Sequence, residues 1–373
     1  MTRCSAGCLA RWLISSFPRF LVSIFLAASA HAAPSVVAVE NGGLLFTDNP
    51  AGVSGTDAGF SSPIGDKTLW IFGDVFLLDP SKPEKPYVGN VSNCGLLVPT
   101  GKGTAPLKRY GFLTNPQTGL ARQLIPLANR EKDDTRLWPG GSWYDAATKR
   151  LYLYYSGISI LGDGVYNFRC NGWGLCVADT SKPEAIRFDR LHPKGREWMW
   201  PNAPGATVYG NATLDGGDWL YVYGAHDDRP GSSARLARVR KTDVTDPEAY
   251  EYFSGSPDKP SWSRKQEDAA DVQGLRDFPS ELSVAYNRYL GGYLAVHNVI
   301  LDDRIRLSLA PHPWGPFTKI ADIGAPRQAL QKNPCYAGKE HPELAEDGGR
   351  IVYITYVDQQ RYWLQLLKVT LKR

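Results

Sequence analysis

Two aspartates mark the ends of a short segment whose residues could catalyse acid–base chemistry. Asp57 and Asp74 lie within GTDAGFSSPIGDKTLWIFGDVF, residues 55–76. If Gly65-Asp66 forms the centre of a two-residue hairpin turn, Asp57 lies directly opposite Asp74. Opposed residues on antiparallel strands have Cβ atoms about 4.5–5.5 Å apart, so two carboxylates at these positions repel each other. An arrangement that costs stability indicates a functional role for the pair.

Paired carboxylic acids are the groups that hydrolyse glycosidic bonds. One carboxyl group protonates the leaving oxygen, while the other carboxylate activates water or attacks the anomeric carbon. Close like charges separate two pKa values, so one group can keep its proton near neutral pH. Glu281, at the start of another expected strand, is a third candidate, as an acid or as a modulator of the pair. The alternative role for each aspartate is structural, because strand-end aspartates often accept hydrogen bonds from turn backbone.

The elements that must position these residues are short β-strands. After residue 32, apolar or aromatic runs of about five to eight residues alternate with Gly, Asp, Asn and Pro, and helical periodicity is hard to find. Five segments repeat one hairpin plan, and their second strands hold Leu69, Leu151, Leu220, Leu294 and Val352 at similar places. Five repeats predict an all-β fold, a five-bladed β-propeller that forms one domain over residues 33–373. A sandwich of unrelated hairpins is the alternative.

The open ends of the five hairpins should meet at one rim. In a propeller, equivalent ends of the inner strands converge around a central depression. The residues expected at this rim, besides the three carboxylates, are Trp138, Trp143, Tyr209, Asn211, His226, Asp227, His297, Tyr336, His341 and Glu343. Polar side chains of this kind bind sugar hydroxyls, and aromatic rings offer faces for stacking on sugar rings. His226 and Asp227 also fit a role as ordinary polar loop residues.

The first 32 residues have the organisation of a secretory signal peptide. Arg3, Arg11 and Arg19 precede the apolar run FLVSIFLAASA, and an A-x-A cleavage site ends at Ala32. The run is much shorter than the ~20 residues of a spanning helix, so no stable membrane insertion is expected. An uncleaved anchor is the alternative. Cleavage near Ala32 would give a secreted or periplasmic protein.

The charge of the mature chain argues against a nucleic-acid partner. The leader carries three arginines and no acid, so its removal lowers the formal charge from +4 to +1. No basic block or stripe remains that could follow a phosphate backbone. The expected partner is a polysaccharide or oligosaccharide, and the protein is expected to be a monomer.

Four cysteines follow the leader, namely Cys94, Cys170, Cys176 and Cys335. An even number in an exported protein favours disulfides. Cys170 and Cys176 flank NGWGL, a plausible hairpin loop, so the predicted pairs are Cys170–Cys176 and Cys94–Cys335. A zinc site is the alternative, although no second close pair of ligands accompanies the first.

Several segments resemble a bacterial domain family that was long of unknown function and that includes endo-D-arabinanases. These segments are GTDAGFSSPIGDKTLWIFGDVF, WLYVYG, SELSVAYNRYLGGYLAVHN, PWGPF and YAGKEHPEL…YITY. The resemblance covers most of residues 40–372, and the first hairpin and HPEL are its most specific parts. It implies an architecture similar to that of five-bladed arabinanases and levansucrase-like enzymes, and cleavage of D-arabinofuranan. It also implies that Asp57 and Asp74 act as the acid and the base.

Two other functions would use the same residues. A non-catalytic glycan-binding propeller would use the rim and its aromatic rings without needing paired acids. A metal-dependent phosphoesterase would hold Ca²⁺ on the propeller axis, with Asp74, Asp227, Glu281 and Asp358 as oxygen ligands. The chain has no basic cluster for a phosphate, so a glycan is favoured, and no cofactor other than this calcium ion is considered. The sequence also has no S-x-D-x-G-x-x-W repeat, H-E-x-x-H, P-loop or G-x-S-x-G motif.

Overall fold

Antiparallel β-strands are the main elements of the fold, which confirms the all-β prediction. The computed structural model describes residues 33–79, 81–128, 131, 134–163, 167–225, 231–278, 281–299, 302–324 and 335–373. These residues contain 25 strands, seven 3-10 helices of three residues each and no α-helix. Within these ranges no helix is long and apolar enough to cross a membrane. The predicted signal peptide lies outside the described residues.

The described strands form six sheets. The first contains β3 (Phe60–Pro63), β4 (Lys67–Phe72), β7 (Cys94–Pro99) and β8 (Gly111–Phe112), and a three-stranded sheet beside it contains β2 (Val53–Thr56), β5 (Val75–Leu78) and β6 (Tyr87–Val91). The next contains β9 (Thr135–Asp145), β10 (Arg150–Ile160), β11 (Phe168–Asp179) and β12 (Asp189–Leu191), with β13 (Trp200–Pro201) paired to β11. Another contains β14 (Val208–Gly216), β15 (Trp219–Ala225), β16 (Ala234–Arg240), β17 (Glu251–Phe253) and β18 (Trp262–Ser263). The last two contain β19 (Ser283–Asn287), β20 (Gly292–Asn298), β21 (Arg304–Ala310) and β22 (Thr318–Gly324), and then β23 (Tyr336–Glu340), β24 (Ile351–Asp358), β25 (Trp363–Lys372) and β1 (Ser35–Leu44).

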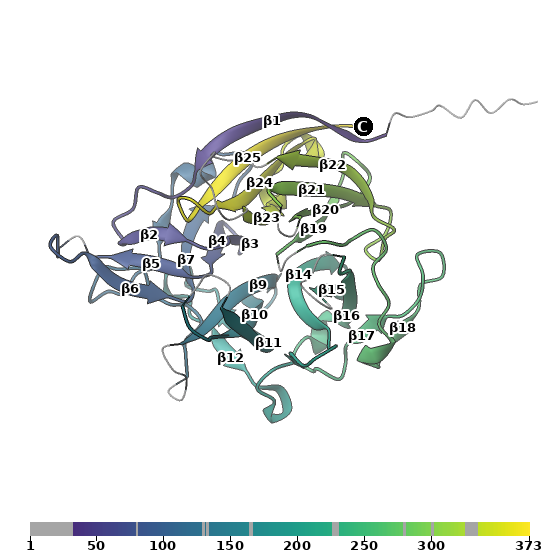
Figure 1. Ribbon diagram of the computed structural model, residues 1–373, viewed down its shortest axis with the longest axis horizontal. Helices are drawn as coiled ribbons and strands as arrows, with labels where there is room; N and C mark the ends of the chain where they lie inside the picture. Colours follow the sequence, from purple (N-terminus) through teal and green to yellow (C-terminus); the bar gives the residue numbers. More distant parts are fainter. Residues whose placement is uncertain are drawn as a thin grey trace, which may run out of the picture. The chain divides into compact units, whose positions relative to one another are not determined.

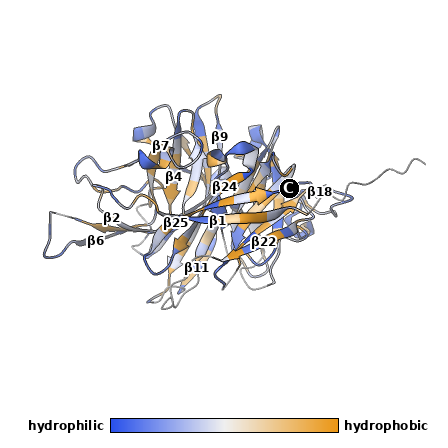
Figure 2. Cartoon of the chain, turned by 90° about the horizontal axis from the view of Figure 1, so that it is seen from above, coloured by the Kyte–Doolittle hydropathy of each residue, from blue (hydrophilic) through white to orange (hydrophobic). Residues whose placement is uncertain are grey.

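The 3-10 helices are single turns within the connections between strands. They are η1 (Pro106–Lys108), η2 (Pro183–Ala185), η3 (Pro193–Gly195), η4 (Lys241–Asp243), η5 (Gln266–Asp268), η6 (Pro342–Leu344) and η7 (Asp347–Gly349). Four of them begin with proline, which is tolerated in a first turn because its missing N–H would have no partner there. The hydrophilic residues gather in such connections, and the hydrophobic residues lie along the strands (Figure 2).

Five of the sheets are arranged around a common centre, and their first strands β3, β9, β14, β19 and β23 lie nearest to it (Figure 1). Contacts link β3 to β9, β9 to β14, β14 to β19 and β19 to β23, in the order of the sequence. The sheet that begins with β23 is completed by β1, which pairs with β25 near the C-terminus. Strands from both ends of the chain therefore close one sheet, and residues Ala33–Arg373 form one compact unit.

The hydrophobic core lies in layers between neighbouring sheets. In β4, Trp70 and Phe72 belong to one buried cluster, whereas Leu69 and Ile71 belong to another that also contains residues of β10. Successive side chains of a strand point to opposite faces, so a strand between two layers is apolar throughout. The five residues predicted at equivalent places in second strands, Leu69, Leu151, Leu220, Leu294 and Val352, are all fully buried.

Four of the five predicted hairpins have the expected strands, and the fifth differs. The pairs β3–β4, β9–β10, β14–β15 and β19–β20 are antiparallel neighbours. In the fifth segment, HPELAEDGG forms η6 and η7 instead of a strand, and the partner of β24 is β23, which precedes this segment. The proline and the glycines of this stretch favour turns over a strand.

The predicted disulfides are wrong. Cys170 and Cys176 both lie in β11, paired with Ile158 and Leu153 of β10. Six residues of strand span about 20 Å at ~3.3 Å per residue, far beyond the ~4.4–6.8 Å between the Cα atoms of a disulfide. The Cys176 thiol donates a hydrogen bond to the Leu153 carbonyl at 3.3 Å instead. No disulfide joins any of the four cysteines of the described chain.

Glycine allows the innermost strands to approach each other closely. A Cβ added at Gly141 of β9 would lie 2.7 Å from the carbonyl carbon of Ala212 in β14. We expect Gly141→Ala to destabilise the protein by about 1–3 kcal/mol, because the two backbones must move apart. Gly111→Ala in β8 is the matched control, since a Cβ there meets no atom within 4 Å. Urea denaturation measures both variants, and equal stabilities would contradict this packing.

Candidate active site

The hairpin β3–β4 brings Asp57 and Asp74 together in the predicted register. The Ile64 N–H donates to the Lys67 carbonyl at 2.7 Å, across the turn at Gly65. Farther along the same ladder, the Asp57 N–H donates to the Asp74 carbonyl at 2.9 Å. The two aspartates are therefore directly opposite each other at the open end of the hairpin.

The backbone around the pair holds the Asp57 carboxylate in place. Ala58 has a φ of 45°, which interrupts the extended chain between β2 and β3. The Gly73 N–H donates to the Asp57 carbonyl at 2.8 Å. A Cβ added at Gly73 would lie 3.1 Å from Asp57 Oδ2, so the carboxylate rests against this glycine. A side chain at position 73 would crowd the carboxylate.

Burial makes Asp57 a group that keeps its proton near neutral pH. Burial and the nearby charge of Glu281 raise the pKa of Asp57 to about 7, with a smaller contribution from Asp74. The Tyr336 hydroxyl donates a hydrogen bond to Asp57, and the Lys339 ammonium lies nearby, and both lower this pKa. Carboxylate oxygens of Asp57 and Glu281 are buried without a hydrogen-bond partner among the described residues. Such oxygens are rare in native proteins and fit a site that awaits a ligand.

Asp74 lies beside a guanidinium cation and an indole N–H. Burial raises its pKa to about 6, while the Arg136 guanidinium and the Trp138 indole N–H act in the opposite direction. Arg136 Nε lies 3.5 Å from Asp74 Oδ1, which identifies the pair as an ion pair. Both neighbours come from β9 of the next sheet. Two carboxyl groups on one hairpin thus differ in their preferred protonation state because different sheets supply their neighbours.

Three residues of this site were not predicted from the sequence, namely Arg136, Lys339 and Tyr362. Lys339 is only 3% exposed, and burial lowers its pKa to about 8 although the charges of Glu281 and Asp57 favour the ammonium form. Its ammonium group lies 4.0 Å from the centre of the Phe60 ring. Tyr362 is hydrogen-bonded to Tyr336 and lies near both aspartates. Lys339 lies in the segment YAGKE beside a second charged residue, and this pattern does not identify its partners.

Three of the sequence-predicted residues gather here with the pair: Glu281, Trp138 and Tyr336. Asn211 is buried at the bulged start of β14. His226 and Asp227 lie outside the described residues. The remaining predicted residues occupy other places.

Two of the predicted aromatic residues do not offer a face to a ligand at this rim. The Tyr209 ring is 0% exposed and packs against Trp200 and Tyr252 in the core. Trp143 lies five residues along β9 from Trp138, near the closed end of its hairpin, and stacks on Tyr152 with ring centres 5.3 Å apart. Aromatic residues near strand ends were assigned to one rim, but tyrosine and tryptophan serve the layers between sheets equally well.

The side chains of His341 and Glu343 are buried, and His341 links two sheets. His341 is 1% exposed, stacks on Trp70, and its ring nitrogens lie 2.6 Å from Ser61 Oγ and 2.7 Å from Thr355 Oγ1. Burial raises the pKa of Glu343, and Ser61 is its hydrogen-bond partner. Both ring nitrogens of His341 thus have partners in β3 and β24, and its expected contact with a ligand stays a prediction.

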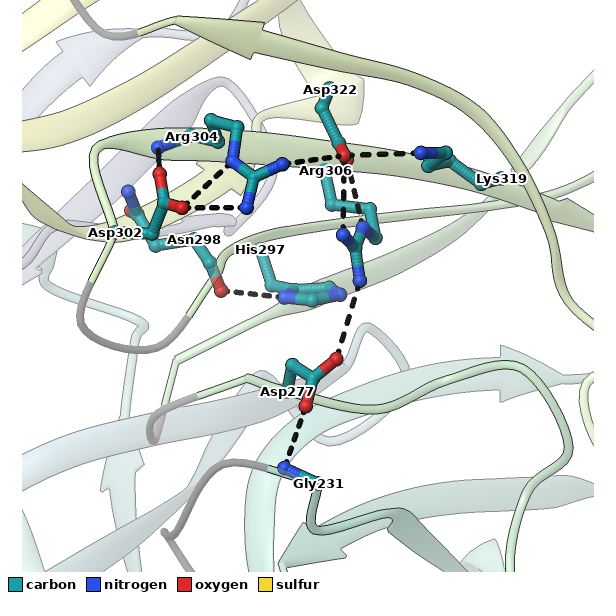
Figure 3. Close-up of polar contacts among 9 residues, drawn as sticks. All are labelled: Gly231, Asp277, His297, Asn298, Asp302, Arg304, Arg306, Lys319 and Asp322. Carbon is teal, nitrogen blue, oxygen red and sulfur yellow. Dashed lines mark hydrogen bonds and ion pairs between the residues drawn. The ribbon is translucent and has the colours of Figure 1, made fainter.

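His297 lies in β20 beside an ionic network that Arg306 and Asp322 of the next two strands form with Asp277 (Figure 3). Its Nδ1–H donates to the Asn298 carbonyl at 2.6 Å, and burial lowers its pKa to about 4, so the ring is neutral. Arg306 donates to Asp322 at 2.8 Å and lies 3.5 Å from Asp277. The His297 ring is fully buried, and its expected contact with a ligand stays a prediction.

The calcium ion considered from the sequence stays a prediction. Within the described ranges, no three His, Cys, Asp or Glu side chains are grouped as metal ligands. The ammonium group of Lys339 lies beside Asp57 and Glu281 and supplies a positive charge at this place. Asp227, one of the expected ligands, is outside the described residues, so a calcium ion that depends on it stays a prediction.

The sequence belongs to a known family. Residues 45–368 match DUF4185, a domain of unknown function, and the chain is therefore a member of this family. No curated protein matches the sequence.

Solved structures share the fold at low sequence identity. A candidate hydrolase from Bacteroides ovatus has 14% identity and a TM-score of 0.65, and the alignment covers 87% of each chain. The catalytic domain of a GH62 α-L-arabinofuranosidase from Coprinopsis cinerea has 10% identity and a TM-score of 0.50, covering 91% of this chain and 98% of that one. At these identities the likeness concerns the fold.

The raised pKa of Asp57 predicts a pH-dependent effect on stability. The folded protein holds a proton on Asp57 up to a pKa of about 7, whereas the unfolded chain releases it near its ordinary value of 3.8. Stability is therefore lost as the pH rises through this window, by at most ~1.4 kcal/mol per pH unit. Asparagine does not titrate, so Asp57→Asn should melt above the wild type at pH 7.5, and the difference should shrink towards pH 4.

Thermal melts of Asp57→Asn and of Asp66→Asn across this pH range provide the measurement. Asp66 is exposed in the turn of the same hairpin, so its variant should follow the wild type at every pH. If Asp57→Asn melted below the wild type at pH 7.5, the carboxylate would be a required hydrogen-bond acceptor rather than a strained buried acid.

Proposed function

We propose that the protein is a glycoside hydrolase that cleaves a furanose-containing polysaccharide, with D-arabinan as the first candidate. The observation that carries this proposal is the buried Asp57–Asp74 pair on opposite strands of one hairpin. Both pKa values are raised towards neutrality, where one carboxyl group can donate a proton and the other can accept one. A protein that only binds glycans has no need for two buried acids that cost stability.

Asp57 is the proton donor and Asp74 is the carboxylate that acts on the sugar. Asp57 has the higher pKa, so it carries the shared proton at neutral pH and gives it to the glycosidic oxygen as the C–O bond breaks. Asp74, paired with Arg136, activates the attacking water or attacks the anomeric carbon itself. Glu281 keeps the pKa of Asp57 high by its charge. The anomer released from the substrate, observed by NMR, distinguishes inversion from retention.

The architecture proposed for this activity is a five-bladed propeller. The five sheets that begin with β3, β9, β14, β19 and β23 are its blades, and their order around the centre supports this assignment. Residues 1–32 are proposed to be a signal peptide removed on export, which N-terminal sequencing of the exported protein tests. The family resemblance of the first hairpin supports the further assignment as an endo-D-arabinanase.

We predict that Asp57→Asn and Asp74→Asn each lower the hydrolysis rate by about 10²–10⁴-fold or more, because an amide is neither a useful proton donor nor a base. Purified mature protein is incubated with D-arabinan and a panel of other furanosides and glycans, and the products are separated by chromatography. Asp66→Asn on the same hairpin is the control and should keep wild-type activity. Wild-type turnover by either active-site variant would overturn the assignment.

The two pKa values also predict the pH dependence of hydrolysis. Activity requires protonated Asp57 and ionised Asp74, so the rate should be greatest between about pH 6 and 7 and fall on both sides. The Lys339 charge lowers the pKa of Asp57, so Lys339→Met should shift the alkaline limb of the profile to higher pH. Lys67→Met, at the turn of the hairpin, should leave the profile unchanged. An alkaline limb that moved to lower pH would contradict these roles.

A further inference from the structure

The three-stranded sheet β2–β5–β6 exposes aromatic side chains beside the candidate site. It extends outward from the ring of sheets in both views (Figures 1 and 2). In β5, Val75 and Leu77 are buried in the core, whereas Phe76 between them is 37% exposed. Tyr87 of β6 is 56% exposed. Exposed aromatic residues that are grouped indicate a binding surface more often than isolated ones do.

These rings continue a series that starts at the carboxylates. The ring centre of Phe76 lies 4.9 Å from that of Tyr362 and 6.4 Å from that of Tyr87. Tyr362 is hydrogen-bonded to Tyr336, and burial raises its pKa, with further contributions from the nearby charges of Asp57 and Asp74, so it lies close to both acids. We call Tyr362, Phe76 and Tyr87 the aromatic row.

The backbone pairing carries the row close to the catalytic pair. Gly55 pairs with Phe76, two residues before Asp57 and two residues after Asp74 in the chain. Asp74 lies in the bend between β4 and β5, and Phe76 is the second residue of β5. Tyr362, whose ring contacts Phe76 and lies near both aspartates, connects the row to the acids.

Gly55 holds the first two rings of the row close together. A Cβ at this position would lie 3.1 Å from Phe76 Cδ2 and 3.1 Å from Tyr362 Cδ1, so the two rings lie against the bare backbone. The Tyr362 carbonyl also accepts a hydrogen bond from the Thr56 N–H at 2.8 Å. The row is thus built on main chain held by strand pairing rather than on a long loop.

We propose that the aromatic row binds successive sugar rings of a polysaccharide chain that leads away from the cleaved bond. This inference rests on the proposed function, because the aromatic row would bind the same chain that Asp57 and Asp74 cleave. Aromatic faces with a polar edge suit sugar rings, which present C–H groups on one face and hydroxyls around it. A binding row beyond the cleavage point favours a long chain over a terminal sugar, and therefore cutting within the polymer.

The tilt of the rings indicates which kind of chain they fit. The planes of Tyr362 and Phe76 are inclined by 40°, and those of Phe76 and Tyr87 by 60°. The row offers no single flat surface of the kind that a rigid, ribbon-like glycan would cover. Successive inclined faces suit a flexible chain whose rings turn relative to one another, as in a furanose polymer.

Tyr87→Ala tests the row without touching the acids. Loss of one stacked sugar should raise KM for intact D-arabinan by about 3- to 10-fold, while kcat and the hydrolysis of short oligosaccharides stay unchanged. Tyr286→Ala is the matched control, because Tyr286 is 53% exposed and paired edge-on with Tyr293 near the closed end of another hairpin. If the wild type and Tyr87→Ala had equal KM values on the polymer, binding of the chain by the aromatic row would be contradicted.

A binding measurement separates the row from the proposed reaction. Retardation of Asp74→Asn and of Asp74→Asn/Tyr87→Ala in gels that contain D-arabinan reports binding without turnover. Weaker retardation of the double variant supports the row even if the wild type hydrolyses nothing, in which case only the proposed function fails. Equal retardation of the two variants, or no retardation of either, would contradict binding by the aromatic row. The proposal would also fail if size-exclusion chromatography showed that Tyr87→Ala changes only the oligomeric state.

Discussion

The candidate site depends on the register of one hairpin. Asp57 and Asp74 share an antiparallel pair, and a slip of one residue would turn one carboxylate to the opposite face. Gly65 at the turn has a φ of 89°, a conformation that glycine adopts at low cost and that fixes the loop length between the strands. The turn thus determines, eight residues away, which side chains meet.

A hairpin alone does not stabilise two buried like charges, so the neighbouring sheets supply the compensating groups. Arg136 and Trp138 come from β9 and act on Asp74, whereas Tyr336 and Lys339 come from β23 and act on Asp57. Because the core lies in layers between sheets, each of these groups is carried by a strand that is packed on both faces. Rigid packing keeps the two carboxyl groups in different environments, which is what a division into acid and base requires.

The sequence allowed some of these features to be predicted and concealed others. Strand periodicity and turn residues are local, so they predicted the register of Asp57 and Asp74 and the buried place of Leu69 and its counterparts. Gly172 and Gly174 misled the disulfide prediction. They lie inside β11, where Trp198 and Tyr155 leave no space for a Cβ, rather than in a turn. Glycine in a strand marks close approach as readily as it marks a loop.

The residues that contact Asp57 and Asp74 could not be predicted from local patterns, because burial of a charged residue depends on contacts distant in sequence. Lys339 and Arg136 are as polar as any surface residue until the sheets assemble around them. The same limit applies to the aromatic residues. Tyr209 is buried between sheets, whereas Tyr362 lies beside the acids, and local sequence does not distinguish the two. Phe76 follows Asp74 by two residues, across the bend between β4 and β5, so one register brings the proposed chemistry close to the proposed path of the chain.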